Sequence, residues 1–396
     1  MHASAQSGAY FRGILIVVYL SLIIEQVIAL LPGASTMSFV IPALVVLIVI
    51  ATLMPLSRHT KWWVRDFDFP RLQIAFVALV VLVAEGFLLD LGERASPVLM
   101  IVTAACLVYQ GWWIFPYTRP YPNEVKMAVG GAPGERLRIL TANVLTPNRN
   151  VDKLIALIRE HKPHVFVTLE TDQWWQDRLD VLDADYPYSM KCPLDNLYGM
   201  HVYSNLPLED GKIQFLVEDD IPSMHAMVEL PSKRKVRMHF LHPAPPSPTE
   251  HDESTERDAE LLVVAKSVAG LDTPVIVAGD LNDVAWSTTT RLFRKISGLL
   301  DPRVGRGMFN SFHADHWFLR WPLDHLFHSR HFTLGFIQRL PHFGSDHFPV
   351  LVELVYDHVR GAEQEGLEAD ADDHALAEEK IAAEPVTVDD VHEPQA

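Results

Sequence analysis

The chain has 396 residues, 49% of them hydrophobic, and its 50 acidic residues outnumber its 33 basic ones, so the formal net charge is −17. This length allows more than one domain. The acidic balance argues against a protein that binds nucleic acid through a broad basic surface, but it is compatible with a nuclease whose contacts are local. Of the two cysteines, Cys106 lies in an apolar stretch and Cys192 in the polar part of the chain, which argues against a disulfide between them. Cysteine usage therefore does not identify the cellular compartment.

The first 117 residues contain apolar stretches that are each about as long as a helix that crosses a bilayer. They predict a transmembrane helical region over residues 1–117. The first stretch is also compatible with a cleaved signal peptide, although no clear small-x-small cleavage site follows it. Glu25 and Glu85 interrupt two of the stretches, which indicates either a functional ionisable group in the membrane or a structural or interfacial side chain. The predicted spans are residues 13–31, 38–56, 72–89 and 97–115.

The orientation of these spans depends on the charges that flank them. The 57–71 loop carries four basic residues, which favours the cytoplasmic side for that loop. If all four stretches cross the membrane, both ends of the chain are predicted to be cytoplasmic. If only three cross, the soluble part is predicted to lie on the other side.

A soluble domain follows a linker rich in Pro and Gly at residues 118–135. Strands outnumber helices in this domain, which spans residues 136–358, and the helices separate early and middle strands. This α+β pattern predicts two packed mixed β-sheets with helices outside. The predicted helices are 150–161 and 253–270, and the predicted strands are 136–143, 164–170, 199–205, 224–230, 235–242, 273–280, 323–329, 332–340 and 347–354.

The end of the chain, residues 359–396, is predicted to be a disordered acidic tail. Residues 361–396 contain twelve Asp or Glu and one Lys, and they have almost no large apolar side chains with which to bury a core. The tail is expected to keep the protein soluble, with regulation or partner binding as the alternative. A basic run at 233–237 is predicted to be a turn that enters a strand, with a phosphate contact as its alternative.

Polar side chains stand at the ends of several predicted strands, which suggests one common rim. The oxygen-bearing residues among them are of the kind that Mg²⁺ prefers, because this hard cation takes carboxylate, amide and water ligands. A metal held by them would polarise a phosphoryl oxygen and orient a water molecule. A zinc hydrolase is the weaker alternative, because the sequence has no His-x-x-x-His on a helix and no Cys pair. The oxygen-bearing residues are Asn143, Glu170, Asp280, Asn282 and Asp346.

Two histidines at strand ends, His242 and His347, are candidates for phosphate contact or proton transfer. Asp324 would orient one imidazole and favour its charged form, in the manner of a catalytic dyad. Within the polar cluster before the last strand, we expect Asp346 to face the metal and His347 to meet Asp324, because neighbours in extended backbone point to opposite sides. Trp286 is interpreted either as an aromatic that binds substrate or as a packing residue.

The motifs T-A-N, L-E, H-P, G-D-L-N, L-D-H and G-S-D-H-F-P occur in this order over residues 137–355. In this order they resemble the endonuclease/exonuclease/phosphatase superfamily, which includes deoxyribonuclease I. The resemblance implies a four-layer α/β sandwich with Mg²⁺ or Mn²⁺ at its rim. With the apolar stretches ahead of it, the chain is similar to a membrane-anchored bacterial branch of that superfamily. This likeness implies a place in the bacterial inner (plasma) membrane.

The resemblance also implies a role for each motif residue. Glu170 would be the principal metal ligand, helped by Asn143 and Asp346, and Asp280 would activate or orient the attacking water. His347 paired with Asp324 would stabilise the phosphoryl transition state. Asn282 would bind phosphate or metal, and His242 would contact phosphate or act as a general acid. Because abasic-site endonucleases carry Tyr where this chain has His242, that subgroup is disfavoured.

Together these observations predict a membrane-anchored, Mg²⁺-dependent phosphoesterase that hydrolyses a phosphodiester, phosphomonoester or diphosphate. A lipid-linked phosphate would suit an anchored domain with little basic surface. The alternative is an endonuclease or exonuclease acting on DNA or RNA, and a weaker one is a non-catalytic membrane scaffold. The expected partners are the lipid bilayer and the phosphorylated substrate, and no stable protein partner is predicted.

Overall fold

A computed structural model describes residues 37–395 of the chain. The chain divides into two compact units. The first unit, which we call the helical unit, extends to residue 116 and also includes residues 246–254. The second, the sandwich unit, contains residues 117–245 and the chain from 255 onward.

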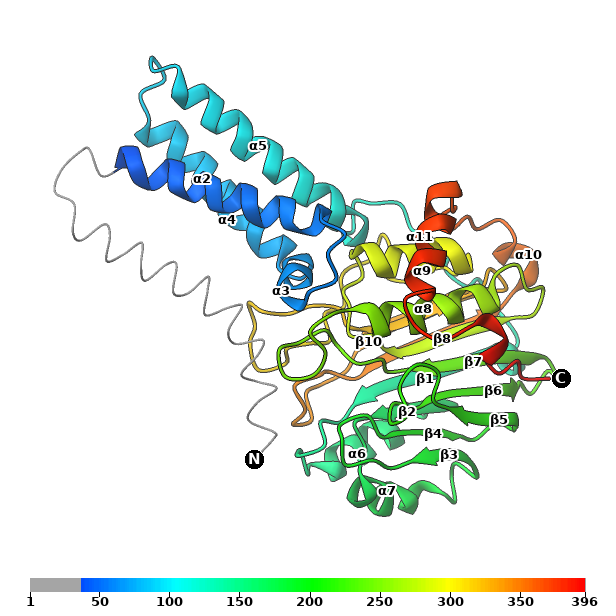
Figure 1. Ribbon diagram of the computed structural model, residues 1–396. Coiled ribbons are helices and arrows are strands. Elements are labelled where there is room, and N and C mark those ends of the chain that lie inside the picture. Colours follow the sequence, from blue (N-terminus) through cyan, green and yellow to red (C-terminus); the bar gives the residue numbers. More distant parts are fainter. Residues whose placement is uncertain (1–36, 396) are drawn as a thin grey trace. The chain divides into compact units, whose positions relative to one another are not determined.

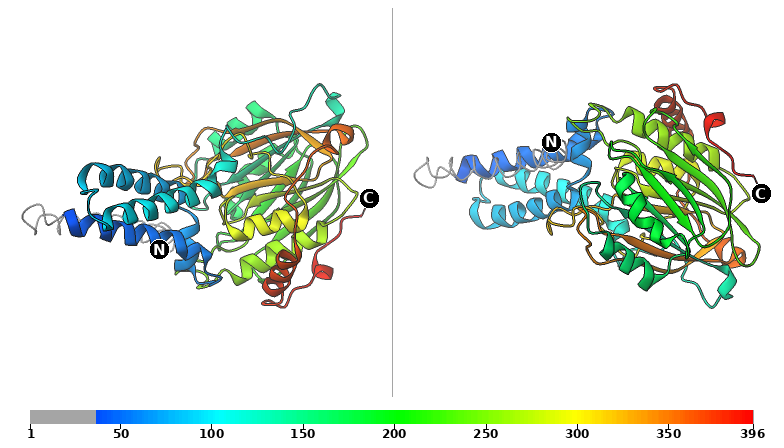
Figure 2. Two further views of the ribbon diagram at one scale, coloured as in Figure 1. Left: turned by 90° about the horizontal axis from the view of Figure 1, so that it is seen from above. Right: turned by 90° about the horizontal axis from the view of Figure 1, so that it is seen from below.

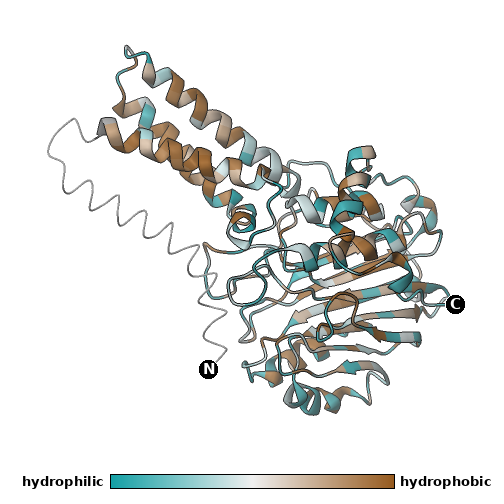
Figure 3. Cartoon of the chain, viewed as in Figure 1, coloured by the Kyte–Doolittle hydropathy of each residue, from teal (hydrophilic) through white to brown (hydrophobic). Residues whose placement is uncertain are grey.

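Three long apolar helices form most of the helical unit: α2 (Met37–Leu53), α4 (Arg71–Leu88) and α5 (Ala95–Ile114). By length and composition each could cross a membrane, and they match the predicted spans 38–56, 72–89 and 97–115. Figure 3 shows that these helices are hydrophobic along most of their length. Such apolar faces suit a lipid environment. The predicted span 13–31 and Glu25 lie outside the described residues. Short helices complete the unit: η1 (Met54–Leu56), α3 (Trp62–Arg65), η2 (Asp66–Asp68) and the start of η3 (Phe115–Tyr117).

Polar side chains inside the helical unit pair with one another. The Arg71 guanidinium donates to Asp68 at 3.1 Å and to Gln110 at 3.3 Å. The carboxylate of Glu85 is fully buried and accepts a hydrogen bond of 3.0 Å from the Thr103 hydroxyl. Glu85 therefore lies in the interior of the unit, which agrees with its interpretation as a structural side chain.

The sandwich unit contains two mixed β-sheets. In the six-stranded sheet the order is β10-β11-β1-β2-β4-β3, and in the five-stranded sheet it is β5-β6-β7-β8-β9. Only two of the described pairs, β1 with β2 and β7 with β8, are parallel. The first sheet comprises β1 (Arg136–Asn143), β2 (Val165–Leu169), β3 (Tyr188–Cys192), β4 (Met200–Ser204), β10 (Phe332–Arg339) and β11 (Val350–Tyr356). The second comprises β5 (Leu208–Gln214), β6 (Ser223–Glu229), β7 (Lys235–Leu241), β8 (Val275–Asp280) and β9 (Asp324–His328).

Helices cover the outer face of each sheet, so the unit has the predicted four layers (Figures 1 and 2). The largest core cluster lies between the sheets and draws apolar side chains from both. Helix α6 (Val151–His161) shows why a helix docks here: Leu154 and Ile158 lie on its apolar face and pack with Phe166 of β2. The other elements are η4 (Pro133–Glu135), α7 (Gln173–Leu179) and η5 (Asp180–Leu182) ahead of the second sheet, and α8 (Thr255–Val268), α9 (Thr288–Ser297), α10 (His358–Gly361), α11 (Ala371–Ile381) and η6 (Val388–Asp390) after β7.

The prediction of a disordered tail at 359–396 is wrong. Helix α11 docks on α8 and α9, where Ala377 and Ile381 join a buried apolar cluster. Ion pairs reinforce this docking, among them Lys380 with the buried Asp258 of α8 at 2.6 Å. Burial alone would raise the pKa of Asp258, but Lys380 and Arg257 hold it well below its usual range. A few small apolar side chains and matched charges thus order a segment whose composition suggested disorder.

Candidate active site at the shared edge of the sheets

The predicted rim exists, because the strand ends that carry the polar residues meet at one edge of the sandwich. Strands β1 and β2 run parallel, which brings Asn143 and the segment after Leu169 to the same edge. In the second sheet, Asp280 at the end of β8 pairs in register with Asp324 at the start of β9. The predicted strand at 347–354 begins as β11 at Val350, so Asp346 and His347 lie in the loop before it.

Hydrogen bonds link the two sheets at this edge. The Asn143 amide donates to Glu170 at 2.8 Å and to Asp280 at 3.3 Å. Nε2 of His347 lies 3.5 Å from Asp280 Oδ2, and its Nδ1 lies 2.8 Å from Asp324 Oδ2. Five predicted site residues therefore form one continuous polar network, and the predicted pair of His347 and Asp324 is present.

The backbone places Glu170 in an unusual conformation. Its φ is 59°, a left-handed value that costs energy for a residue with a side chain. The Thr146 hydroxyl holds this turn by donating to the Glu170 carbonyl at 2.6 Å. Gly199 passes so close that a Cβ there would lie 1.8 Å from the Thr171 carbonyl oxygen, so only glycine fits. The turn aims the Glu170 carboxylate at the rim.

The Glu170 carboxylate has a free oxygen that could bind a divalent cation. Its Oε2 is buried and has no hydrogen-bond partner among the described residues. Burial, together with the nearby charge of Asp346, raises the pKa of Glu170 to about 8. Asp346 itself is half-buried and the Asn143 amide lies next to Glu170, so the carboxylate and amide groups present fit Mg²⁺ or Mn²⁺.

The pKa of His347 is governed by two neighbouring carboxylates. Burial would lower its pKa, but the carboxylates of Asp324 and Asp280 raise it to about 10, so the imidazole is charged at neutral pH. Asp280, Asp324 and His347 lie close enough together to suggest a metal site, with ligand atoms within 4.8 Å of one another. Both ring nitrogens of His347 face carboxylates, at 2.8 Å from Asp324 and 3.5 Å from Asp280, so we interpret this trio as an ion-paired dyad with Asp280 beside it.

Asp280 and Asn282 occupy a tight loop after β8. The Asn282 backbone N–H donates to Asp280 Oδ1 at 2.9 Å, and the Asn282 side-chain amide donates to the Pro243 carbonyl at 2.9 Å. The second bond leaves the Asn282 side-chain oxygen as the atom that can face a ligand. Gly279 is required before Asp280 because a Cβ there would lie 1.9 Å from the carbonyl oxygen of Leu241.

The two remaining predicted residues are His242, which lies near Asp280 and His347, and Trp286. His242 is buried, its Nδ1 has no partner among the described residues, and burial lowers its pKa to about 4. A neutral imidazole suits contact with phosphate better than proton donation. Trp286 is 1% exposed and packs edge-on against Tyr117, with 6.0 Å between the ring centroids. Packing is thus its visible role, and a contact with substrate stays a prediction.

Several positioning residues were not predicted from the sequence. The Ser345 hydroxyl donates to the Asn143 carbonyl at 2.8 Å and accepts from the His347 backbone N–H at 3.0 Å. The buried Arg257 of α8 donates to the Asn282 carbonyl at 2.8 Å. The Phe312 ring lies 4.9 Å from that of His347. Apart from the bond between Ser345 and His347, these contacts join residues that are distant along the chain, so local sequence carries no signal for them.

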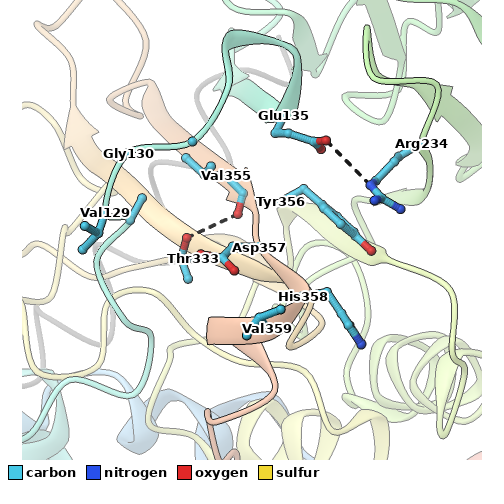
Figure 4. A pocket seen from close by; sticks show the side chains of 12 residues that line it. Val129, Gly130, Glu135, Arg234, Thr333, Val355, Tyr356, Asp357, His358 and Val359 are labelled. Carbon is cyan, nitrogen blue, oxygen red and sulfur yellow. Dashed lines mark hydrogen bonds and ion pairs between the residues drawn. The ribbon is translucent and has the colours of Figure 1, made fainter.

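A separate pocket lies at the opposite end of the first sheet, around Tyr356 at the end of β11 (Figure 4). There the Arg234 guanidinium carbon lies 4.4 Å from the centroid of the Tyr356 ring, and Arg234 Nε lies 3.7 Å from Glu135 Oε1. Arg234 belongs to the basic run 233–237, which forms the turn between β6 and β7 as predicted. This position excludes the run from the rim.

The sequence model of the Endonuclease/Exonuclease/phosphatase family matches residues 140–347. The chain therefore belongs to this family, whose match covers the whole rim. A comparison with curated proteins gives no match.

Among solved structures, the chain is similar to an endonuclease/exonuclease/phosphatase from Beutenbergia cavernae DSM 12333, with 17% identity, a TM-score of 0.46, and coverage of 56% of this chain and 72% of that one. It is also similar to D. rerio TDP2 complexed with a single-strand DNA product, with 16% identity, a TM-score of 0.46 and coverage of 55% and 98%. The human Nocturnin catalytic domain shows 14% identity, a TM-score of 0.46 and coverage of 58% and 97%.

Proposed function

We propose that the protein is a membrane-anchored phosphoesterase that depends on Mg²⁺ or Mn²⁺ and acts on a lipid-linked phosphate or diphosphate at a bacterial inner (plasma) membrane. The observation that carries the proposal is the polar network at the rim. It places an unpartnered carboxylate oxygen of Glu170 and the charged His347–Asp324 pair on either side of Asp280.

The chemistry is an in-line attack of water on phosphorus, in which the new P–O bond forms as the P–O bond to the leaving alcohol or phosphate breaks. Glu170, Asn143 and Asp346 would hold the divalent cation, which polarises the phosphoryl oxygen and neutralises developing charge when bound. Asp280 orients the attacking water and accepts its proton through a carboxylate oxygen. The His347 imidazolium donates a hydrogen bond to a phosphoryl oxygen, where negative charge grows in the transition state. Asn282 and the neutral His242 orient the phosphate.

The helices favour a cytoplasmic position for the catalytic domain. If α4 and α5 both cross the membrane, the 57–70 loop before α4 and the domain after α5 lie on the same side. The side of the domain then follows the charge of this loop, and not the number of spans as expected from the sequence, whether or not residues 13–31 cross. The loop is rich in Lys and Arg, as cytoplasmic loops are. Lys61 in this loop also pairs with Asp252 at 2.5 Å and with Glu253 at 2.9 Å. Asp252 and Glu253 belong to residues 246–254, between β7 and α8, which is consistent with a shared side.

This topology predicts the behaviour of reporter fusions. A cytoplasm-active fluorescent protein fused after Gln395 should fluoresce, and alkaline phosphatase fused there should be inactive. Alkaline phosphatase fused within the 89–94 loop, between α4 and α5, should be active and serves as the control. The opposite pattern at the two sites would place the domain outside the cytoplasm.

The substrate proposal is tested with the full chain in detergent or nanodiscs. With Mg²⁺ or Mn²⁺ we expect release of phosphate from a polyprenyl diphosphate, and no release in excess chelator. Activity that persists in chelator would contradict the metal-dependent mechanism. Cleavage of plasmid DNA or RNA without release of phosphate from lipid would replace the proposal by a nuclease. Inactivity on every phosphoester would favour a membrane scaffold.

A further inference from the structure

An exposed aromatic pair stands on a loop beside the rim. The loop joins Phe312 to Trp321 and carries Trp317 and Phe318 near its middle; we call it the aromatic loop. Trp317 is 80% exposed and Phe318 is 50% exposed, and their rings meet edge-on at 5.6 Å. Large aromatic side chains exposed together in this way mark a binding surface.

The base of the aromatic loop is attached to the segment that carries the site residues. The Ala314 backbone N–H donates to the Asp346 carbonyl at 2.6 Å. Phe312 exchanges backbone hydrogen bonds with Trp321, and the Phe312 ring lies against His347 at 4.9 Å. Whatever the tip binds is therefore held next to Asp346 and His347.

The loop also holds its own shape by backbone contacts. The His313 N–H donates to the Leu319 carbonyl at 3.1 Å, and the Leu319 N–H donates to the His316 carbonyl at 3.1 Å. The Arg320 guanidinium closes the loop by donating to the Ala314 carbonyl at 2.9 Å. These bonds do not involve the Trp317 side chain, which remains largely exposed to another surface.

Positive charge flanks the base of the aromatic loop. The guanidinium carbons of Arg320 and Arg339 lie 4.9 Å and 4.3 Å from the centroid of the Phe348 ring. Both side chains remain partly exposed. Phe348 directly follows His347, so both guanidinium groups lie close to the rim. An apolar tip with cations behind it matches an anionic bilayer surface, where aromatic rings enter the interface and cations meet lipid phosphates.

We propose that the aromatic loop docks on the bilayer, with Trp317 and Phe318 in the interfacial layer, and presents a lipid phosphate to the rim. The statement about substrate rests on the proposed function; docking itself does not. The bilayer is favoured over nucleic acid because apolar helices of membrane-spanning length end at Tyr117, shortly before β1 begins at Arg136.

Docking can be measured without activity. An environment-sensitive fluorophore is attached to Trp317→Cys in a full chain that carries Cys106→Ala and Cys192→Ala, reconstituted in phosphatidylglycerol nanodiscs. The matched control is Val359→Cys, a 77% exposed site beyond the opposite end of β11. We expect blue-shifted emission and quenching by brominated lipid at position 317 alone, and a weaker effect in phosphatidylcholine. Equal, water-like emission at both positions would overturn the proposal.

The substrate statement needs a second experiment. In the Trp317→Ala/Phe318→Ala variant, kcat/KM for a bilayer-presented lipid phosphate should fall about tenfold more than for a short soluble phosphodiester, because apolar burial at the interface is lost. Val359→Ala should leave both unchanged. An equal fall for both substrates would contradict the statement, and so would a selective loss of DNA cleavage, which would make the loop a nucleic-acid contact. A wild-type chain inactive on all substrates would refute the proposed function, while the fluorescence would still decide docking.

Discussion

Replacing Glu170 by Gln is expected to lower kcat/KM on every phosphoester substrate by about 10³-fold, because the metal contributes several kcal/mol to the transition state. The substitution keeps the shape of the side chain and an oxygen that can accept the Asn143 hydrogen bond. It removes the charge on the carboxylate whose second oxygen has no partner among the described residues. The fold should therefore persist while metal binding fails.

Calorimetry separates these two effects. In chelator, Glu170→Gln should melt at or slightly above the wild-type temperature, because it relieves a buried carboxylate whose pKa is raised to about 8. Addition of Mn²⁺ should raise the wild-type Tm and leave the variant unchanged. Glu260→Gln is the matched control, since Glu260 is a buried carboxylate of α8, outside the rim network, with its pKa also raised to about 8. Manganese-dependent activity that survives in Glu170→Gln would exclude Glu170 as the principal ligand.

Replacing Asp324 by Asn is expected to lower kcat by about 10²- to 10⁴-fold, the range over which positioned proton donors and their partners act. Asp324 holds His347 at 2.8 Å, and with Asp280 it raises the pKa of that imidazole to about 10. Without this carboxylate the pKa of His347 falls. The imidazolium is then lost at lower pH, and the basic limb of the pH–rate profile should move to lower pH.

The pH profile distinguishes this positioning role from simple loss of stability. Asp301→Asn removes another fully buried, ion-paired carboxylate, which bonds Arg303 at 2.9 Å, and should lower Tm without moving the basic limb. Manganese should still stabilise Asp324→Asn, because its metal-side residues are intact. If Asp324→Asn lost activity equally at all pH values, His347 would not act as the charged donor.

Much of the fold could be predicted from local pattern. Strand β1 begins and ends at the predicted residues, and α6 begins one residue later than predicted, because alternating and helical periodicities report which face is buried. Strands β3 and β5 were missed because they are edge strands with little burial, and the sequence LEDGKIQ of β5 looks like a polar loop. An edge strand forms because its neighbour offers unpaired backbone groups, which local propensity does not record.

The sequence by itself determined the residues of the site and their positions at strand ends, since the motif order and the residue types specify which chemistry is available. The pair of His347 and Asp324 was predicted as well. Only the tertiary structure decided how the two sheets join at the site: Asn143 bridges Glu170 and Asp280, because this contact depends on how the sheets pack. The same holds for α11, whose few buried side chains acquire stability only against α8 and α9. Contacts between distant residues are set by packing, and their energy is absent from any local segment of the chain.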